Sequence, residues 1–448
     1  MGKYFGTDGV RGTANKDLDV VLAYKTGLAA ASVLYEDIKQ TNQTNNKDSK
    51  DKPKIIIGKD TRISGDMFES AISAGICAAG CDVVLLGVVP TPAVAFIVKE
   101  CGFDAGVMIS ASHNQAFDNG IKIFGSQGVK LSDELEAKIE QLIDKSDEIK
   151  LAVGADIGRV TRDDTLVDKY IARITEISTI SQTKKILIDC ANGSASATAR
   201  KIFETADIIN CTPDGLNINE NCGSTHIDVL ANRVKSGGYD IGFAFDGDAD
   251  RCLAVDENGE LICGDKIVCA LAEWMKIDTI AVTKLSNIGL HEFCKSHDIK
   301  IEETDVGDKF VLERMLERNI KLGGEQSGHI IALDYATTGD GQLAAMLMLK
   351  ILCDSLKKAS DIFGAMRVYP QVAVNVKVAN EQKPIIMQDE DVLTAVRDIE
   401  SKLGDTGRVL LRPSGTEPLI RIMLEGEHLQ TIKEYAHEIE RVILEKIA

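Results

Sequence analysis

The sequence contains few aromatic residues and comparatively few positive charges. Only 5% of its 448 residues are Phe, Trp or Tyr, and 69 acidic residues against 51 Lys and Arg give a formal net charge of −18. This negative charge argues against nucleic acid and anionic membranes as partners. An anionic substrate would therefore need local basic pockets.

Long apolar runs and closely spaced cysteine pairs are also missing. No apolar run approaches the roughly 18 residues of a membrane span, and the N-terminus does not resemble a signal peptide, so we expect a cytoplasmic protein. The eleven cysteines are scattered, odd in number and without a C-x-x-C pair. Reduced, buried thiols fit this distribution better than disulfides or a zinc site.

What the chain does contain is a repeated alternation of strand-like and helical stretches, over a length that suggests three or four domains. This alternation predicts an α/β protein with three tandem similar α/β domains of mixed, mostly parallel sheets, and a smaller C-terminal α+β domain. The expected boundaries are 1–153, 154–255, 256–368 and 369–448. A polar tract at 40–54 predicts a surface loop between a helix and a strand.

The most informative motif is an acidic loop, Asp246-Gly247-Asp248-Ala249-Asp250-Arg251, that directly follows the strand-like run 241–245. Its three carboxylates can point hard oxygen ligands at one Mg²⁺, and Arg251 can hold a phosphate. A calcium loop ending at Glu257 is an alternative, but it lacks the glycine expected at its sixth position and a preceding helix. A solvated acidic turn is the other alternative.

A second motif places two serines after an apolar strand, in Ser110-Ala111-Ser112-His113-Asn114. Adjacent residues in an extended chain face opposite ways, so Ser112 and His113 would make a poor acyl-transfer pair. A serine that carries a phosphoryl group needs only a metal and cations nearby. The residues alone leave Ser110 and Ser112 as competing candidates.

Two glycine-containing turns complete the set. In the turn 323–329, Glu325 and Ser327 can bind sugar hydroxyls and His329 can share proton transfer, although a lone histidine after a loop is often structural. In the turn 412–418, arginines, hydroxyls and backbone N–H groups predict a phosphate site, against the alternative of an ordinary tight turn.

Together these motifs resemble one family, the α-D-phosphohexomutases. The likeness runs over nearly the whole chain, through residues 5–12, 110–114, 246–251, 324–329, 337–341 and 412–418. The resemblance implies four domains around a central cleft, which carry in turn a phosphoserine loop, a metal-binding loop, a sugar-binding loop and a phosphate-binding loop.

The resemblance also implies residue roles. The phosphoserine matches Ser112, and one Mg²⁺ per chain would be held by Ser112, Asp246, Asp248 and Asp250. The other catalytic positions are His113, Lys122, Arg11 and His329. The substrate-binding positions are Gly307, Asp308, Lys309, Glu325, Ser327, Arg412, Ser414, Gly415, Thr416 and Arg421. Gln115 replaces the proline usual in the family, which affects the stiffness of that turn and not the chemistry.

The implied activity is the interconversion of glucosamine 6-phosphate and glucosamine 1-phosphate, for UDP-N-acetylglucosamine and cell-wall precursors. Phosphorylated Ser112 and a 1,6-bisphosphate would carry the reaction, with glucosamine or glucose 1,6-bisphosphate as activator. A same-family enzyme for mannose or glucose phosphates is one alternative, and a metal-dependent sugar phosphatase is another. The expected partner is a small sugar phosphate, with no nucleic acid and no membrane, and the oligomeric state is left open.

Overall fold

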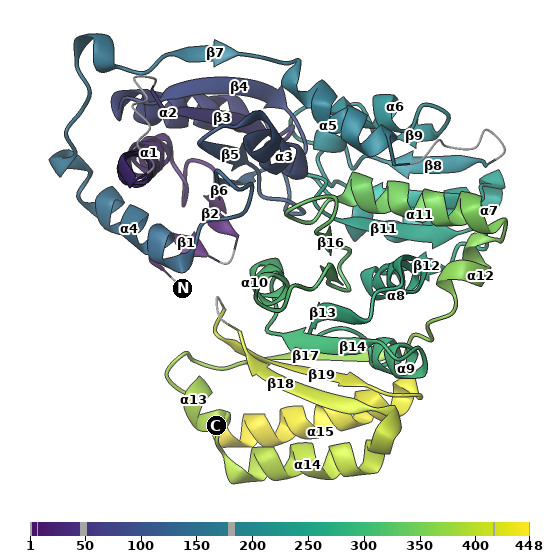
Figure 1. Cartoon of the computed structure of the whole chain (residues 1–448). Coiled ribbons are helices and arrows are strands. Elements are labelled where there is room, and N and C mark those ends of the chain that lie inside the picture. The colour runs from purple at the N-terminus through teal and green to yellow at the C-terminus, as the bar shows by residue number, and fades with distance from the viewer. Residues whose placement is uncertain (1, 7, 45–51, 178–183, 415–416, 448) are drawn as a thin grey trace. The chain divides into compact units, whose positions relative to one another are not determined.

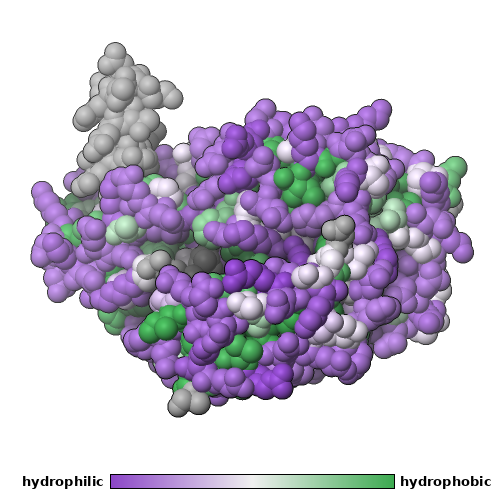
Figure 2. All heavy atoms as spheres, turned by 90° about the horizontal axis from the view of Figure 1, so that it is seen from below, coloured by the Kyte–Doolittle hydropathy of each residue, from purple (hydrophilic) through white to green (hydrophobic). Residues whose placement is uncertain are grey.

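A computed structural model describes residues 2–6, 8–44, 52–177, 184–414 and 417–447. The chain forms two compact units, one of residues 1–285 with 299–365 and the other of residues 286–298 with 366–448. No described helix has both the length and the apolar character needed to cross a membrane. The face in Figure 2 is mostly hydrophilic, with hydrophobic residues in small separate patches, as the charge predicts.

The first unit begins with a mixed sheet in which four neighbouring strands pair in parallel and the other pairings are antiparallel. Its core is built on Ile55 and Ile57, which pack with Phe68 and Ile72 of a covering helix. In order across the sheet, the strands are β1 (Phe5–Gly6), β2 (Gly9–Thr13), β6 (Asp118–Gly125), β5 (Ala105–Ile109), β3 (Lys54–Lys59), β4 (Asp82–Val88) and β7 (Val160–Arg162). Its helices are α1 (Val20–Thr44), α2 (Gly65–Ala78), α3 (Thr91–Cys101) and α4 (Asp133–Asp144).

Two more mixed sheets in the first unit each have parallel pairings on one side, out to the edge strand, and antiparallel pairings on the other side. One has the order β12 (Leu261–Ile262), β11 (Cys252–Asp256), β10 (Ile241–Phe245), β8 (Ile186–Asp189) and β9 (Asp207–Ile209). The other has the order β14 (Lys300–Thr304), β13 (Thr279–Thr283), β15 (Leu322–Gly324) and β16 (Ile330–Ala332).

The helices of this part of the chain pack on these two sheets or on one another. They are α5 (Leu166–Thr175), α6 (Ala199–Ile202), α7 (Ile227–Gly237), α8 (Gly264–Met275), α10 (Asp308–Arg318), α11 (Gly341–Ser355) and α12 (Ala359–Phe363). Helix α11 lies beside β11 (Figure 1), so residues from the third expected domain cover the sheet of the second. Burial explains this position, because α11 is apolar on nearly every side from Leu343 to Leu352.

The second unit is a small α+β fold. Its antiparallel sheet has the order β17 (Gln371–Lys377), β19 (Leu419–Glu425) and β18 (Arg408–Pro413). The hydrophobic core forms where Ile420, Ile422 and Leu424 of the central strand pack with Ile399 and Ile439. Its helices are α9 (Ile288–Ser296), α13 (Lys383–Ile386), α14 (Glu390–Leu403) and α15 (Leu429–Ile447).

The predicted fold class is confirmed, with two local differences. Helix α1 continues to Thr44, so the start of the expected surface loop at 40–54 is helical, and residues 45–51 lie outside the described chain. Strand β7 joins the first sheet although it follows residue 153. It extends the parallel part of that sheet as an exposed edge strand beside β4.

Candidate active site

The acidic loop follows β10, a strand buried along its whole length between β8 and β11. Asp246 and Asp248 have no exposed surface and Asp250 is 5% exposed. One oxygen from each carboxylate lies within 4.8 Å of the others. Because the three charges are buried together, the alternative of a solvated turn is wrong.

The calcium-loop alternative is also wrong. The carboxylate of Glu257, which would close such a loop, accepts a hydrogen bond of 2.5 Å from the Ser360 hydroxyl and another of 3.1 Å from its backbone N–H. The residues between the loop and Glu257 form strand β11. Glu257 is therefore a structural acceptor away from the three aspartates.

The two candidate serines have different partners. The Ser112 hydroxyl donates a 2.6 Å hydrogen bond to Asp246 Oδ2. The Ser110 hydroxyl donates one of the same length to Asp60 and accepts the Ser112 backbone N–H at 2.9 Å. Ser110 thus supports the turn, and Ser112 faces the acidic loop.

His113 lies closer to Ser112 than an extended chain predicts. Ser112 has a φ of 53°, in the left-handed region, and this turn brings His113 Nδ1 to 3.4 Å from the Ser112 hydroxyl. The Arg251 guanidinium lies 2.9 Å from the same nitrogen. Burial and then Arg251 lower the pKa of His113 to about 4, so the ring is neutral near pH 7.

Lys122 is the buried cation of this cluster. Its Nζ lies 2.8 Å from Asp248, 3.0 Å from Asp8 and 3.4 Å from Asp250. Burial opposes the charge, but these carboxylates outweigh it and hold the pKa of Lys122 well above its usual value. Arg11, on β2, pairs with Asp8 and so adds a second cation nearby.

The acidic loop fits a hard divalent cation. Asp248 Oδ1 and Asp250 Oδ1 are buried without a hydrogen-bond partner among the described residues. Burial and then the neighbouring Asp250 and Asp248 raise the pKa of Asp246 well above its ordinary value. A bound cation would supply the missing partners and favour three ionised carboxylates, which is the donor set that Mg²⁺ prefers.

The turn 325–329 brings His329 to the acidic loop. His329 Nδ1 lies 3.7 Å from Asp250, and Nε2 lies 3.6 Å from Asp308. Burial lowers the pKa of His329, but these carboxylates outweigh it, so the net pKa is raised. In the same turn Glu325 is half-buried and Ser327 is exposed, and burial raises the pKa of Glu325.

The segment 307–309 joins this cluster at the start of α10. Gly307 has a φ of 136°, a conformation that favours glycine, and it precedes the first residue of the helix. Asp308 forms an ion pair of 2.6 Å with Lys130, which also pairs with Asp8. Lys309 pairs with Asp133 and, at 3.5 Å, with Glu136 of α4. Lys309 is therefore held by protein carboxylates.

The predicted phosphate turn lies in the second unit. Arg412 on β18 stands directly opposite Arg421 on β19, and burial together with Arg421 lowers the pKa of Arg412. Arg421 pairs with Glu417, and Ser414 is buried with its hydroxyl accepting the Glu417 backbone N–H at 3.2 Å. Gly415 and Thr416 lie outside the described residues.

Lys383, a residue that the sequence analysis did not identify, fixes this turn. Its Nζ donates to the backbone carbonyl oxygen of Ser414 at 2.8 Å and also to that of Glu417. Apart from its backbone pairing with β19, Arg412 makes no hydrogen bond or ion pair with the described residues. A cation held close to another cation, with no anion of its own, is suited to bind an anionic ligand.

Two further residues missed by sequence reasoning hold the Ser112 loop. Buried Arg62 donates to the backbone carbonyl oxygens of Ser112, Asn114, Gln115 and Asp118, and pairs with Asp60. Asn219 donates to the Ser112 and Asn114 carbonyl oxygens at 3.0 Å each. Side-chain bonds to distant backbone carbonyls leave no pattern in a sequence, so no motif could have revealed them.

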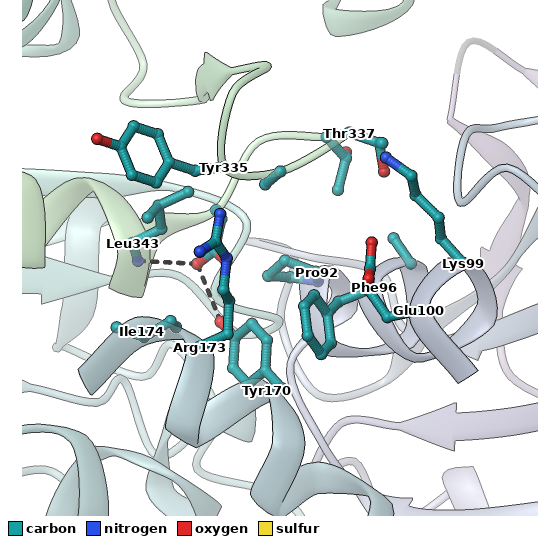
Figure 3. Close-up of a pocket in the computed structure, with 14 residues that line it drawn as sticks. Pro92, Phe96, Lys99, Glu100, Tyr170, Arg173, Ile174, Tyr335, Thr337 and Leu343 are labelled. Carbon is teal, nitrogen blue, oxygen red and sulfur yellow. Dashed lines mark hydrogen bonds between the residues drawn. The ribbon is translucent and has the colours of Figure 1, made fainter. Parts of the chain in front are cut away.

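A separate pocket of about 430 Å³, including its open mouth, lies between α3, α5 and the segment 335–343 (Figure 3). Phe96 and Tyr170 meet edge to face in its wall, with ring centres 6.0 Å apart. The Tyr170 hydroxyl donates to Asp340 at 2.9 Å, and Asp340 caps α11 by accepting the Leu343 N–H. Burial raises the pKa of Asp340 to about 7. None of the predicted site residues lines this pocket.

The chain matches four domain descriptions in order. They are Phosphoglucomutase/phosphomannomutase alpha/beta/alpha domain I over residues 2–150, domain II over 168–259, domain III over 263–369, and the C-terminal domain over 374–442. A phosphoglucosamine mutase from Clostridium botulinum (strain Eklund 17B / Type B) is 49% identical over 459 residues, with 100% of both chains covered.

Solved structures show the same fold. A phosphoglucomutase/phosphomannomutase family protein from Burkholderia thailandensis superposes with a TM-score of 0.79 at 21% identity, covering 99% of this chain and 98% of that one. An N-acetylphosphoglucosamine mutase from Aspergillus fumigatus, in complex with GlcNAc-6P and magnesium, superposes with a TM-score of 0.68 at 16% identity, covering 99% and 96%. At these identities the likeness concerns the fold alone.

Proposed function

This chain belongs to the phosphoglucomutase/phosphomannomutase family, the α-D-phosphohexomutases, and on that premise we propose that it interconverts glucosamine 6-phosphate and glucosamine 1-phosphate. The observation that carries the chemistry is the 2.6 Å hydrogen bond from the Ser112 hydroxyl to Asp246, in a buried triad beside Lys122. The choice of glucosamine rests on the full-length relatives named phosphoglucosamine mutase.

In this proposal Ser112 carries the phosphoryl group. Phosphorylated Ser112 donates it to the free hydroxyl of the sugar phosphate, which gives a 1,6-bisphosphate, and then recovers the other phosphoryl group. Asp246 would share the proton of the free Ser112 hydroxyl, a role supported by their hydrogen bond, and the charged Lys122 would offset the negative charge of the transferring group. Glucosamine or glucose 1,6-bisphosphate acts as activator because it regenerates phosphorylated Ser112.

Asp246, Asp248, Asp250 and the phosphoryl group on Ser112 would hold one Mg²⁺. When bound, the cation withdraws charge from the transferring phosphoryl group and so lowers the barrier to its transfer. Around it, Arg251 and Arg11 contribute positive charge, and neutral His113 contacts Ser112. His329 exchanges a proton with the sugar hydroxyl, a role supported by its place between two carboxylates.

Substrate binding is assigned to three segments: Gly307, Asp308 and Lys309; Glu325 and Ser327; and Arg412, Ser414, Gly415, Thr416 and Arg421. The half-buried carboxylate of Glu325 can accept hydrogen bonds from sugar hydroxyls. Arg412 would bind the phosphate that is not reacting. The same proposal includes the domain boundaries 1–153, 154–255, 256–368 and 369–448, with strand β7 crossing back to the first sheet, as well as a cytoplasmic location and a role in cell-wall precursor supply.

A coupled assay of the purified protein with Mg²⁺ tests the function. Glucosamine, glucose and mannose 6-phosphates are offered separately, and the 1-phosphate product and inorganic phosphate are both measured. We expect the highest kcat/KM for glucosamine 6-phosphate and no phosphate release. A preference for glucose or mannose phosphate would reassign the substrate, and phosphate release without isomerisation would indicate a phosphatase.

A further inference from the structure

Cys190 and Cys211 lie one residue after β8 and two residues after β9, which are neighbouring parallel strands. The strands pair Asp189 with Ile209, and the Cys190 backbone N–H donates to the Ile209 carbonyl oxygen at 3.2 Å. The side chains of Cys190 and Cys211 interact across this strand edge, and the Cys211 Sγ also lies 3.7 Å from the Ser196 carbonyl oxygen. We propose that Cys190 and Cys211 are a redox modification site, which closes to a reversible disulfide when the protein meets a peroxide.

The two thiols are unequal in a way that suits this chemistry. Cys211 is partly exposed, whereas Cys190 is fully buried. The side-chain interaction with Cys190, assisted by the nearby Arg200 guanidinium, lowers the pKa of Cys211 to about 6. The lowered pKa favours the reactive thiolate form of Cys211, its partial exposure makes it accessible to a small oxidant, and Cys190 is its resolving partner.

The oxidation balances with one peroxide molecule. The Cys211 thiolate attacks one oxygen of hydrogen peroxide, the O–O bond breaks, and the departing hydroxide takes up a proton to become water. Cys190 then loses its proton and attacks the resulting sulfenic acid at sulfur. The S–S bond forms as the S–O bond breaks, and the second hydroxide leaves as water. The two thiols lose two electrons, and the peroxide gains them.

Cys81 and two partly exposed cysteines provide the comparison for this pair. Burial, followed by nearby carboxylates, raises the pKa of Cys81 to about 12. Cys101 and Cys353 are also partly exposed, and they serve as matched controls. A redox site fits an otherwise reduced set of cysteines, because transient disulfides are the usual kind in reducing compartments.

The segment after Cys190 connects this pair to the acidic loop. The Ser194 N–H donates to the Gly247 carbonyl oxygen at 2.8 Å, and the Ala191 carbonyl accepts the Asn219 N–H at 2.9 Å. Asn219 in turn holds the Ser112 carbonyl. Ala191 and Asn192 have φ values of 54° and 48°, so this segment tolerates little further displacement. A disulfide that moves Cys190 will therefore disturb the loop of Asp246, a consequence that rests on the proposed function.

Peptide mapping of the full chain without reduction tests the modification directly. After treatment with hydrogen peroxide we expect loss of two hydrogen atoms, a Cys190–Cys211 cross-linked peptide, and reversal by dithiothreitol. The Cys211→Ser variant should form no cross-link, whereas the Cys101→Ser and Cys353→Ser controls should form it as the parent does. Oxidation of Cys211 to sulfinic acid without a cross-link, or a cross-link between other cysteines, overturns the proposal.

Activity provides an independent second readout. We expect the cross-linked protein to lose most of its mutase rate, dithiothreitol to restore it, and Cys211→Ser to resist peroxide while keeping the parent rate. A cross-link that leaves the rate unchanged overturns the coupling to the acidic loop. The peptide mapping needs no enzyme activity. If the protein had no mutase activity, the proposed function would be rejected, and the disulfide proposal would still be decided by the mapping.

Discussion

Arg62 donates a hydrogen bond of 2.9 Å to the backbone carbonyl oxygen of Ser112. The same guanidinium bonds to the carbonyl oxygen of Asn114 at 2.8 Å and to Asp60 at 2.8 Å. One fully buried side chain thus fixes the backbone of the turn that carries Ser112, the proposed phosphoryl carrier. This explains how the turn keeps its shape with the exposed Gln115 in place of the proline usual in the family.

Removing Arg62 should therefore lower turnover without touching substrate. We expect Arg62→Met to lower kcat much more than it raises KM, because Ser112 loses its alignment and not its chemistry. It should also lower the free energy of unfolding by about 3–5 kcal/mol, since Asp60 is left as a buried, unpaired charge. Urea unfolding and steady-state kinetics measure both effects.

Two variants control this experiment. Arg162→Met removes an exposed arginine that forms an ion pair with nearby Asp164, and it should leave kcat and the free energy of unfolding unchanged. The double variant Arg62→Met/Asp60→Asn should regain part of the stability while kcat stays low. Recovery of kcat together with stability would show that Arg62 acts on folding alone.

The acidic loop should lose Mg²⁺ affinity when any of its carboxylates is neutralised. Asp246→Asn, Asp248→Asn and Asp250→Asn each remove one negative oxygen ligand, and we expect affinity to fall at least about tenfold, the loss seen even for outer-shell partners. Isothermal titration calorimetry measures it. Glu257→Gln is the matched control, because Glu257 binds Ser360 and should not affect Mg²⁺. Unchanged Mg²⁺ affinity in all three Asn variants would show that this loop is not the cation site.

Asp340 should make stability depend on pH. Its pKa is about 7 in the folded protein against an ordinary value of 3.8, so between these values the folded state holds a proton that the unfolded chain has released. The contribution of Asp340 to the free energy of unfolding therefore falls as the pH rises from about 4 to 7, by at most about 4 kcal/mol. Above about pH 7 this contribution no longer changes with pH.

The Asp340→Asn variant isolates this contribution. Asparagine also caps helices well and can still accept the Tyr170 hydroxyl and the Leu343 N–H, but it does not titrate. Urea unfolding at pH 5 and pH 8 should show a smaller loss of stability in Asp340→Asn than in the parent protein. An equal loss in both proteins would contradict the raised pKa.

Arg412 should matter for binding and for retention of the intermediate. If it holds the non-reacting phosphate, Arg412→Ala raises KM by roughly 10- to 100-fold, the loss expected for a charged hydrogen bond. The variant should also depend more strongly on added glucose 1,6-bisphosphate, because the intermediate escapes more often. Arg397→Ala, at an exposed arginine on α14 of the same unit, is the control. Equal bisphosphate dependence in Arg412→Ala and the parent would reject this role.

Local patterns in the sequence predicted much of the fold and part of the site. The strand Ile241–Phe245 and the acidic loop after it are contiguous, so alternating carboxylates after an apolar run were enough to indicate them. The position of α11 on the sheet of the second expected domain was not predicted. The apolar pattern of a helix indicates that the helix is buried, but it does not indicate against which sheet the helix packs.

The supporting residues of the site escaped prediction for a related reason. Arg62 lies 50 residues before Ser112, and Asn219 lies 107 residues after it. Lys130 and Asp308 are 178 residues apart. Arg62 reaches Ser112 because strands β3 and β5 are neighbours in one sheet, and the other two pairs are brought together by the packing of separate sheets. The left-handed backbone at Ser112 also changed the expected geometry, since it placed His113 beside the hydroxyl that an extended chain would turn away.

The most direct test of the proposed mechanism follows one phosphoryl group. Protein carrying ³²P on Ser112 is mixed with unlabelled glucosamine 6-phosphate and Mg²⁺, and the label is traced by chromatography in a single turnover. We predict that label leaves Ser112 for a sugar 1,6-bisphosphate and then for sugar monophosphates, with none in inorganic phosphate, and that Ser112→Ala takes up no label. Label that passes to inorganic phosphate, or remains on the protein while isomerisation proceeds, would contradict the mechanism.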